Sequence, residues 1–354
     1  MLIFTNSSHA LHAGRREMFR GRLTPCYEVP ARIDQVLAEL GRRPMGEIRT
    51  PPPISDALLE RVHSRRYLDF LRSAWAEWIA EDPTNVETDA LPSVWPVRSF
   101  RDDVEPANFT ARLGLYSFDV GTPLTAGTWL AAREGGACAA AAATALREPS
   151  SPRATMALTR PPGHHAGWDF FGGYCFINNA AVAAQALLDA GARRIAVLDV
   201  DYHHGNGTQS LFYERADVLT ISIHGDPRFE YPFYLGHADE HGKDAGEGFN
   251  LNIPLSAGTD FTRWRAALMT ALHRVRDYDP DALVVALGVD TFEGDPISCF
   301  KLKSEDYIQL GRDLSATRLP VVFTLEGGYA VAAMGVNVVN VLEGFLSRGS
   351  LEGT

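Results

Sequence analysis

One stretch of the chain, Ile195–Gly207, reads Ile-Ala-Val-Leu-Asp-Val-Asp-Tyr-His-His-Gly-Asn-Gly. Its apolar first half is typical of a strand that is buried on both faces of a parallel sheet. Asp201 and His203 stand two residues apart, so in an extended chain they point the same way and can converge on one ion. Burying carboxylates at a strand end is costly unless they are paired or bind a metal. An isolated Asp-x-His is more often an ordinary polar strand end, so the rest of the site must be found elsewhere.

Strand and helix patterns alternate on both sides of this stretch. Apolar runs predict six strands, at Leu2–Thr5, Ala154–Thr159, Arg194–Val200, Val218–Ile223, Ala282–Leu287 and Pro320–Leu325. Helical spacing of apolar residues predicts helices at Val29–Leu40, Ile54–Ala80 (in two pieces), Thr128–Arg147, Asn178–Ala190, Phe261–Tyr278, Ser304–Thr317 and Val336–Ser347. The alternation predicts an α/β fold with a mostly parallel sheet between helices. Ligands of such sheets bind beyond the carboxyl ends of the strands.

Two segments show no clear pattern. His9–Tyr27 is polar and rich in arginine, and we predict an irregular loop there. Glu81–Thr125 is rich in Pro, Asp, Asn and Thr, and a segment of that length without structure is usually a lid, a binding loop or an oligomerisation arm. We expect it to be part of the domain rather than a linker, because its aromatic residues need burial. These residues are Trp95, Phe100, Phe109, Tyr116 and Phe118.

Composition limits the class of protein. A chain of 354 residues that is 45% hydrophobic can form one large α/β domain or two ordinary ones. It shows neither an apolar run near the ~20 residues of a membrane span nor a signal-peptide core. Four scattered cysteines favour reduced thiols in a cytoplasmic enzyme. A net charge of −11 argues against nucleic acid as a partner and favours cationic small molecules, although charge also simply keeps proteins soluble.

Polar motifs follow four of the predicted strands. Asp290, after one of them, joins Asp201 and His203 in an Asp/His/Asp set with a fourth position open, which is typical of a catalytic rather than a structural zinc. Fe²⁺ suits the same ligands. His164 and His165 follow the stiff turn Pro-Pro-Gly, and two adjacent imidazoles facing a metal indicate acid–base chemistry. The motifs His-Glu-x-x-His and Gly-x-Ser-x-Gly are absent.

Together these motifs resemble the zinc-dependent deacetylases of the arginase/histone deacetylase fold. The matching segments, in the family's order, are Pro161–His165, Asp199–Gly207, Gly288–Thr291 and Glu326–Tyr329. Glu17, Gly21-Arg22, Glu28-x-Pro30 and Gly172–Asn179 resemble the bacterial acetylpolyamine amidohydrolase branch, which extends the match to nearly the whole chain. The resemblance implies a single domain over residues 1–354 with an eight-stranded sheet. It also implies that residues 81–125 are an insertion that forms a dimer and narrows the substrate tunnel.

The resemblance further implies roles for single residues. Asp201, His203 and Asp290 would hold the metal, and Tyr329 would donate a hydrogen bond to the developing oxyanion. His165 would be the general base and then the acid, with Asn206 as its partner. Many histone deacetylases have Asp in place of Asn206, so His165 should be less basic here. His164 would pair with Asp199 and carry a positive charge.

For the substrate, the resemblance implies aromatic tunnel walls at Tyr174 and Tyr231 and a backbone carbonyl from Gly173. Ile297 stands where a polyamine-selective animal relative has a glutamate. We therefore expect any preference for polyamines to come from rim carboxylates, namely Glu17 and Glu105. The family's monovalent-cation site matches Asp199, Asp201, His203 and Ser222, which implies a potassium ion. Cys175 is expected to be buried packing rather than a nucleophile.

The resemblance favours a cytoplasmic, homodimeric zinc amidohydrolase that removes acetyl groups from acetylated polyamines or similar small cationic amines. A protein acetyl-lysine deacetylase is the main alternative, because the chemistry is the same. A non-catalytic binder of acetylated ligands is a third hypothesis, against which the intact site residues argue. An arginase-like dinuclear hydrolase is disfavoured, since the chain offers a single Asp/His/Asp set.

Overall fold

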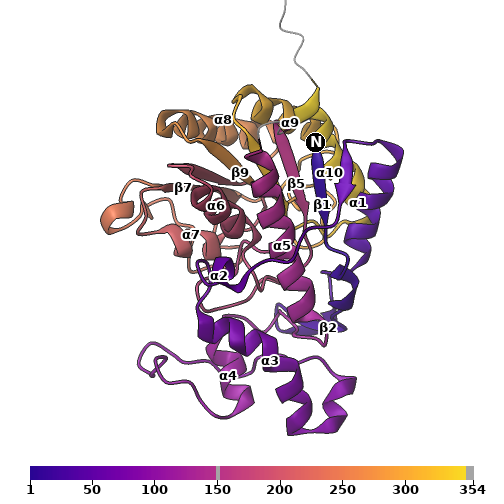
Figure 1. Ribbon diagram of the computed structural model, residues 1–354, viewed down its shortest axis with the longest axis vertical. Coiled ribbons are helices and arrows are strands. Elements are labelled where there is room, and N and C mark those ends of the chain that lie inside the picture. Colours follow the sequence, from indigo (N-terminus) through magenta and orange to yellow (C-terminus); the bar gives the residue numbers. More distant parts are fainter. Residues whose placement is uncertain (149–151, 348–354) are drawn as a thin grey trace, which may run out of the picture.

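The central sheet has eight strands, and every pair of neighbours is parallel (Figure 1). The computed structural model describes residues 1–148 and 152–347, so residues 149–151 and 348–354 of the expected domain lie outside the described residues. In sheet order the strands are β4 (Glu47–Arg49), β1 (Leu2–Thr5), β5 (Ala154–Leu158), β10 (Val321–Leu325), β9 (Ala282–Leu287), β6 (Ile195–Asp199), β7 (Val218–Gly225) and β8 (Asn250–Leu255). All six predicted strands are confirmed.

Helices cover both faces of this sheet (Figure 1). One face carries α5 (Thr128–Leu146) and α6 (Asn179–Asp189). The other carries α1 (Ala31–Arg42), α8 (Phe261–Tyr278), α9 (Asp306–Ala316) and α10 (Val331–Leu346). Along β6 the fully buried side chains alternate, with Ile195 and Val197 in one core and Ala196 and Leu198 in the other. None of the helices in the described residues is both long and apolar enough to cross a membrane.

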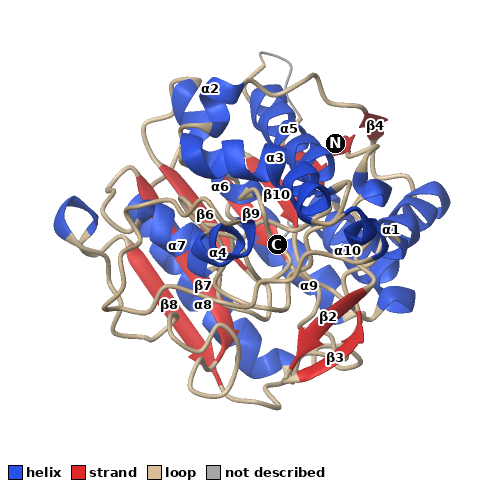
Figure 2. Cartoon of the chain, turned by 90° about the horizontal axis from the view of Figure 1, so that it is seen from below, coloured by secondary structure: helices blue, strands red, loops and turns tan. Residues whose placement is uncertain are grey.

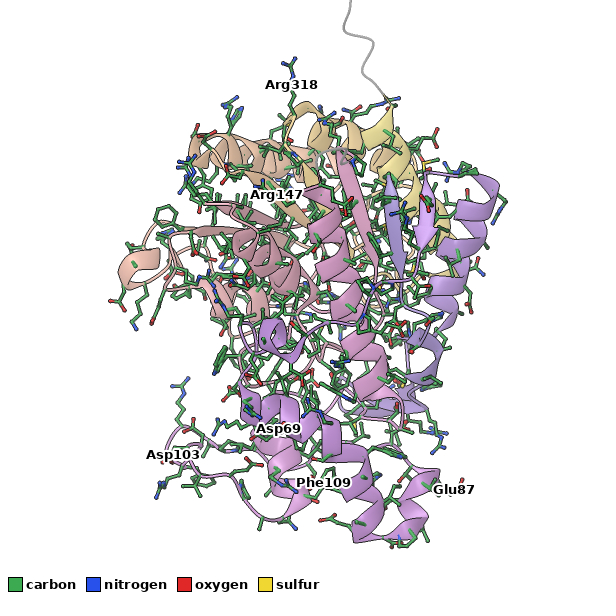
Figure 3. The ribbon with its side chains drawn as sticks, viewed as in Figure 1. Asp69, Glu87, Asp103, Phe109, Arg147 and Arg318 are labelled. Carbon is green, nitrogen blue, oxygen red and sulfur yellow. The ribbon has the colours of Figure 1, made fainter. Side chains whose placement is uncertain are left out.

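A further layer lies beyond the carboxyl ends of the strands, at the lower end of Figure 1. It contains α2 (Asp56–Leu59), α3 (Arg65–Glu81), η2 (Pro83–Glu87) and α4 (Phe109–Leu115). Figure 2 views the molecule from that end and shows loops and α4 in front of the sheet. Figure 3 shows Glu87 and Asp103 projecting from this layer, at the opposite end of the molecule from Arg318. The loops at the strand ends are therefore enclosed between the sheet and this layer.

The aromatic residues of segment 81–125 do not all behave as expected. Phe109 and Tyr116 are buried and stack on Phe70, with ring centroids 6.3 and 4.7 Å away. Trp95 donates a hydrogen bond from its indole nitrogen to Ser117 Oγ at 2.9 Å. The prediction that Phe100 needs burial is wrong, because that side chain is 65% exposed. One end of the segment is thus anchored in the core while its tip presents an apolar side chain to solvent.

The predicted irregular loop at His9–Tyr27 is wrong. Its first residues form the short helix η1 (His9–Leu11), and the rest contains the antiparallel hairpin β2 (Arg16–Phe19) and β3 (Arg22–Pro25). The turn residues Arg20 and Gly21 both have positive φ, 48° and 78°, as a type I′ turn requires. Arginine is an unusual first residue for that turn, and the hairpin stands apart from the main sheet, so neither turn signal nor apolar alternation revealed it.

Other differences have similar physical causes. The strands β4 and β8 were not predicted, because both lie at the edges of the sheet and have no continuous buried run. The helix α7 (Asn206–Phe212) and the short helix η3 (Asp244–Gly246) were also missed. Helix α10 begins before the predicted Val336, at Val331. Gly335 obscured that first turn, and it is a glycine because a Cβ there would overlap the backbone of Gln35 in α1.

The contact between α4 and the segment before it gives a test of the fold. A Cβ on Gly114 would overlap the carbonyl oxygen of Val94, so Gly114→Ala should lower the free energy of unfolding by about 1–3 kcal/mol. Gly41 in α1 has nothing within 4 Å of the same position, and Gly41→Ala should raise stability by about 0.5–1 kcal/mol. Urea unfolding of both variants measures the difference. Equal effects would contradict the packing of segment 81–125 against α4.

Candidate active site

Four adjacent strands bring the polar motifs together. In the sheet β5, β10, β9 and β6 are neighbours, and all four end at the same edge because the sheet is parallel. Their carboxyl ends lead into the four polar segments, namely Arg160–His165, Glu326–Tyr329, Gly288–Asp295 and Val200–His204. Motifs that are far apart in the sequence therefore form a single cluster in space.

Asp201, His203 and Asp290 meet at this edge with their ligand atoms within 4.8 Å of one another. His203 Nδ1 lies 3.0 Å from Asp290 Oδ2 and 3.3 Å from Asp201 Oδ1. Both carboxyl groups are fully buried. Burial and the charge of Asp201 raise the pKa of Asp290 to about 8. Two buried carboxylates this close require a cation to remain charged together.

The backbone around these three residues leaves room for an ion. A Cβ on Gly288 would overlap the Asp201 carboxylate, and one on Gly327 would lie 2.5 Å from Asp201 Oδ2 and 2.6 Å from Asp290 Oδ2. Gly327 N donates to Asp201 Oδ2 at 2.7 Å, and Tyr202 N donates to Asp290 Oδ1 at 2.8 Å. These main-chain N–H groups therefore orient the two carboxylates. The set of two carboxylates and one imidazole suits Zn²⁺ or Fe²⁺.

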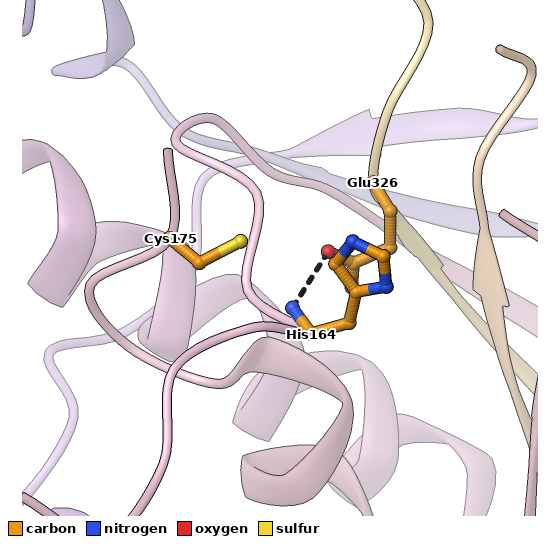
Figure 4. A group of neighbouring side chains, drawn as sticks. All are labelled: His164, Cys175 and Glu326. Atoms are coloured by element: carbon orange, nitrogen blue, oxygen red, sulfur yellow. Dashed lines mark hydrogen bonds between the residues drawn. The ribbon is translucent and has the colours of Figure 1, made fainter. Parts of the chain in front are cut away.

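Figure 4 shows a second group of possible ligands, His164, Cys175 and Glu326. It adjoins the first group, because His164 Nε2 lies 3.9 Å from Asp201 Oδ1. The side chains of this second group already have other roles. Glu326 Oε2 accepts from the backbone nitrogens of Gly163 and His164, at 2.6 and 3.1 Å. Burial raises the pKa of the Cys175 thiol well above its ordinary value, so this residue is packing, as expected, rather than a thiolate. This group supports the histidine turn instead of holding a metal.

The tandem histidines have different partners and different protonation states. His164 Nδ1 lies 2.9 Å from Asp199 Oδ2. Burial alone would lower the pKa of His164, but the charges of Asp199 and Asp201 raise it to about 10. His165 Nδ1 lies 2.6 Å from Asn206 Oδ1, which can only accept, so Nδ1 carries the hydrogen. Burial and the imidazoles of His164 and His203 hold the pKa of His165 well below its ordinary value.

Tyr329 is held in place by two residues that the sequence did not suggest. Its backbone nitrogen donates to Asp295 Oδ2 at 2.7 Å. Arg32 donates from Nε to the carbonyl of Gly328 at 2.7 Å, also binds the carbonyl of Glu326, and lies 4.9 Å from the Tyr329 ring centroid. Burial raises the pKa of the Tyr329 phenol well above its ordinary value, so it remains a hydrogen-bond donor at neutral pH.

A cavity of about 460 Å³ opens over these residues. Its lining is mainly aromatic and includes Tyr174 and Tyr231 as the sequence suggested, together with Trp95, Phe118, Phe233, Tyr234 and Tyr329. His165, His203 and Ile297 also line it. Gly173 has φ 55°, and a Cβ there would overlap the His165 ring, so glycine is required for this close approach.

Neither of the rim carboxylates expected from the sequence lines this cavity. Glu17 is 1% exposed and lies behind Tyr174, whose hydroxyl donates to Glu17 Oε1 at 2.8 Å. Burial raises the pKa of Glu17 to about 7. Glu105 lies on the outer surface, where Oε2 accepts from the Tyr116 hydroxyl at 2.9 Å. The expectation that they form the cavity rim is corrected: Glu17 supports the wall, and Glu105 lies outside it.

Two residues of the expected monovalent-cation site lie on neighbouring strands, and the other two, Asp201 and His203, follow β6. Asp199 at the end of β6 is in register with Ser222 of β7. The Asp201 backbone nitrogen donates to Asp199 Oδ1 at 3.1 Å, while Ser222 Oγ lies 2.8 Å from His224 Nδ1. The side chains are buried next to the Asp/His/Asp set.

Known proteins are similar to this chain over nearly its whole length. The sequence profile of the histone deacetylase domain matches residues 26–345. The chain belongs to the histone deacetylase family. It is 51% identical over 345 residues to acetylpolyamine amidohydrolase 2 of Pseudomonas aeruginosa, with 98% of each chain covered. It is 44% identical over 344 residues to the acetylpolyamine amidohydrolase of Mycoplana ramosa, with 97% of this chain and 99% of that protein covered.

A solved structure shares the fold. The crystal structure of an acetylpolyamine aminohydrolase from Burkholderia pseudomallei superposes with a TM-score of 0.92 at 36% identity, and the match covers 100% of both chains. The single-domain deacetylase fold expected from the motifs is thereby confirmed.

Within this histone deacetylase fold, sequence reasoning missed four residues at the site. Arg32 and Asp295 fix the Tyr329 turn, and Asp119 and Glu230 are the acidic residues among the described residues that line the cavity. Asp119 follows Phe118 in a segment without periodicity. Arg32 lies two residues after Glu28-x-Pro30, but within a predicted helix, where an arginine is ordinarily exposed. Only Asp295, inside the segment Gly288–Pro296, carried a sequence signal that could have found it.

The buried Glu17 gives a test by pH. Its ordinary carboxyl pKa is 4.5 and the folded-state pKa is about 7, so between these values the folded state holds a proton that the unfolded state has lost. Its contribution is complete below pH 4.5 and disappears as the pH rises through 7. Stability should fall by up to about 1.4 kcal/mol per pH unit in this window because of Glu17. Glu17→Gln should remove that slope in urea unfolding curves, whereas parallel pH profiles would show that Glu17 takes up no proton.

Proposed function

We propose that this chain is a zinc-dependent amidohydrolase that removes acetyl groups from acetylated polyamines or similar small cationic amines. The observation that carries the proposal is the buried Asp201, His203 and Asp290 set, whose His203 lines an aromatic cavity with two carboxylates in its lining. The names of the relatives from Pseudomonas aeruginosa and Mycoplana ramosa support the same substrate class.

The metal would be held by Asp201 Oδ, His203 Nδ1 and Asp290 Oδ, with one side open to the cavity. Zn²⁺ bound there would supply Lewis acidity toward the acetyl carbonyl. Fe²⁺ suits the same donors, and metal analysis of purified protein distinguishes the two ions.

The neighbouring side chains supply the proton transfers. His165 is neutral with its hydrogen on Nδ1, so Nε2 is free to take a proton from water and then return it to the leaving amine. His164, paired with Asp199, keeps a positive charge beside the reacting group. Tyr329 keeps its phenolic hydrogen and can donate it to the negative charge that develops on the acetyl oxygen.

The cavity suits a slender chain with a cationic end. Tyr174 and Tyr231 line it on two sides, and aromatic faces attract an alkylammonium group. The Gly173 backbone lies against the His165 ring, and we propose that its carbonyl accepts from the substrate amide nitrogen in place of the weak donor Cys175 Sγ, which lies 3.3 Å from it. The net charge of −11 favours such cations and opposes nucleic acid as a partner.

We also propose a potassium ion bound by Asp199, Asp201, His203 and Ser222. The register of Asp199 with Ser222 supports it, because it places two buried residues with side-chain oxygens side by side on adjacent strands. A cytoplasmic location agrees with the thiols of Cys26, Cys138, Cys175 and Cys299, which are all free.

The proposal is tested by comparing kcat/KM for acetylputrescine, acetylcadaverine, acetylspermidine and an acetyl-lysine peptide on the zinc-loaded protein. We expect the acetylated polyamines to be preferred. Comparable rates on the peptide would favour a protein deacetylase instead.

Tyr329→Phe should keep zinc and fold while lowering kcat by about 10²–10³. Asp290→Asn should lose the zinc itself, measured by mass spectrometry. A wild-type protein purified without zinc would contradict the proposed metal. A Tyr329→Phe variant with near-normal kcat would contradict the proposed role of Tyr329.

Segment 81–125 is proposed to be a dimerisation arm. Several of its large apolar side chains are about half exposed or more, namely Val86, Val94, Val97, Phe100 and Val104. Exposed apolar side chains gathered in one segment favour a protein interface.

Phe100→Asp should weaken the dimer at least about tenfold in sedimentation velocity, because a charge would be buried at an apolar contact. Met269→Asp on α8, at a side chain that is 37% exposed, is the matched control and should leave the dimer intact. A wild-type protein that sediments as a monomer would contradict the proposal.

A further inference from the structure

Glu230 is a nearly buried carboxylate at the wall of the aromatic cavity. It lies in the loop after β7, where its backbone nitrogen donates to the carbonyl of Asp226 at 3.0 Å. The residue is 9% exposed, and the next residue, Tyr231, lies with its ring centroid 5.1 Å from that of His165. The carboxylate therefore belongs to the same cavity as the proposed reacting groups.

The carboxylate of Glu230 has no strong donor in good hydrogen-bond geometry. Among the described residues, its contact within hydrogen-bonding range is the weak donor Cys299 Sγ at 3.6 Å, and the buried Tyr202 hydroxyl lies nearby without completing a hydrogen bond of its own. Asp119, the other acidic residue of the lining, is different. It already accepts from the Tyr231 hydroxyl at 2.6 Å and from the backbone nitrogens of Gly173 and Gly121 at 2.7 and 3.0 Å. A buried carboxylate without donors is costly, so Glu230 is the one suited to receive a cation.

A cation of the chain already stands next to Glu230. Arg20 lies at the tip of the β2–β3 hairpin, and its guanidinium nitrogen is 3.6 Å from Glu230 Oε2. The Arg20 side chain is 66% exposed and its guanidinium lies 5.3 Å from the Phe19 ring centroid. An ion pair of this length with one exposed partner is weak and can be displaced. Arg20 thus balances the charge of Glu230 in the free protein, but it leaves the carboxylate available to another cation.

We propose that Glu230 binds the free ammonium group of the substrate and that Arg20 is displaced from it on binding. This inference rests on the proposed function, because it assigns the specificity for the cationic end of an acetylated amine. It explains how the cavity selects a cation although Glu17 and Glu105 do not line it. Arg20 lowers that selectivity by competing for the same carboxylate.

The test compares acetylputrescine with N-pentylacetamide, in which a methyl group replaces the ammonium. The quantity measured is the ratio of the two kcat/KM values on the zinc-loaded protein. Glu230→Gln should lower this ratio about tenfold, and Arg20→Gln should raise it about threefold. Glu247→Gln, at an exposed acid outside the cavity lining, removes the same charge from the protein and should leave the ratio unchanged.

A second measurement does not depend on turnover. Calorimetric titration with putrescine should show about tenfold weaker binding to Glu230→Gln than to the wild type. An unchanged ratio and unchanged putrescine affinity in Glu230→Gln would overturn the inference. If that variant does not fold, a ratio that fails to rise in Arg20→Gln overturns it. Loss of hydrolysis of both substrates in the wild type would refute the proposed function instead, and the putrescine titration would still decide the role of Glu230.

Discussion

Two buried carboxylates that share one imidazole set the physical constraint on this site. Asp201 and Asp290 are fully buried, and His203 Nδ1 lies 3.3 and 3.0 Å from them. Such charges are stable in a protein interior only with a cation and with oriented hydrogen-bond donors. The parallel sheet meets this need, since β6 and β9 are adjacent and end at the same edge. The glycines at 288 and 327 then keep side chains out of the space between the carboxylates.

Electrostatics also gives the adjacent residues His164 and His165 different protonation states. His164 faces the Asp199 carboxylate and is protonated, whereas His165 faces the amide of Asn206 and is neutral. A turn that presents both imidazoles to one site therefore provides a fixed positive charge and a proton acceptor together. Environments that push the pKa values of neighbouring groups apart are how enzymes assign acid and base roles.

The sequence was most informative where burial is complete and local. Strands such as β6 and β9 are continuous apolar runs with polar motifs at their carboxyl ends, so both the sheet and the Asp201, His203 and Asp290 set could be predicted. The β2–β3 hairpin could not be, because its turn begins with Arg20 and its strands lie outside the main sheet. Glu17 shows a different limit. The family resemblance placed this charged residue near the site, but the side of the cavity wall on which it lies depends on the packing of Tyr174.

The contact of Arg32 with the Tyr329 turn has a consequence for biosynthesis. The guanidinium binds the carbonyls of Glu326 and Gly328, which follow it by 294 and 296 residues along the chain. During translation the first helix leaves the ribosome long before its partners exist, and Arg32 has no way to reach its final position. The turn that carries Tyr329 can be completed only after every strand of the sheet has been synthesised, because the last strand, β10, ends at Leu325. A chain that stops before Glu326 lacks the Arg32 contacts that hold this turn.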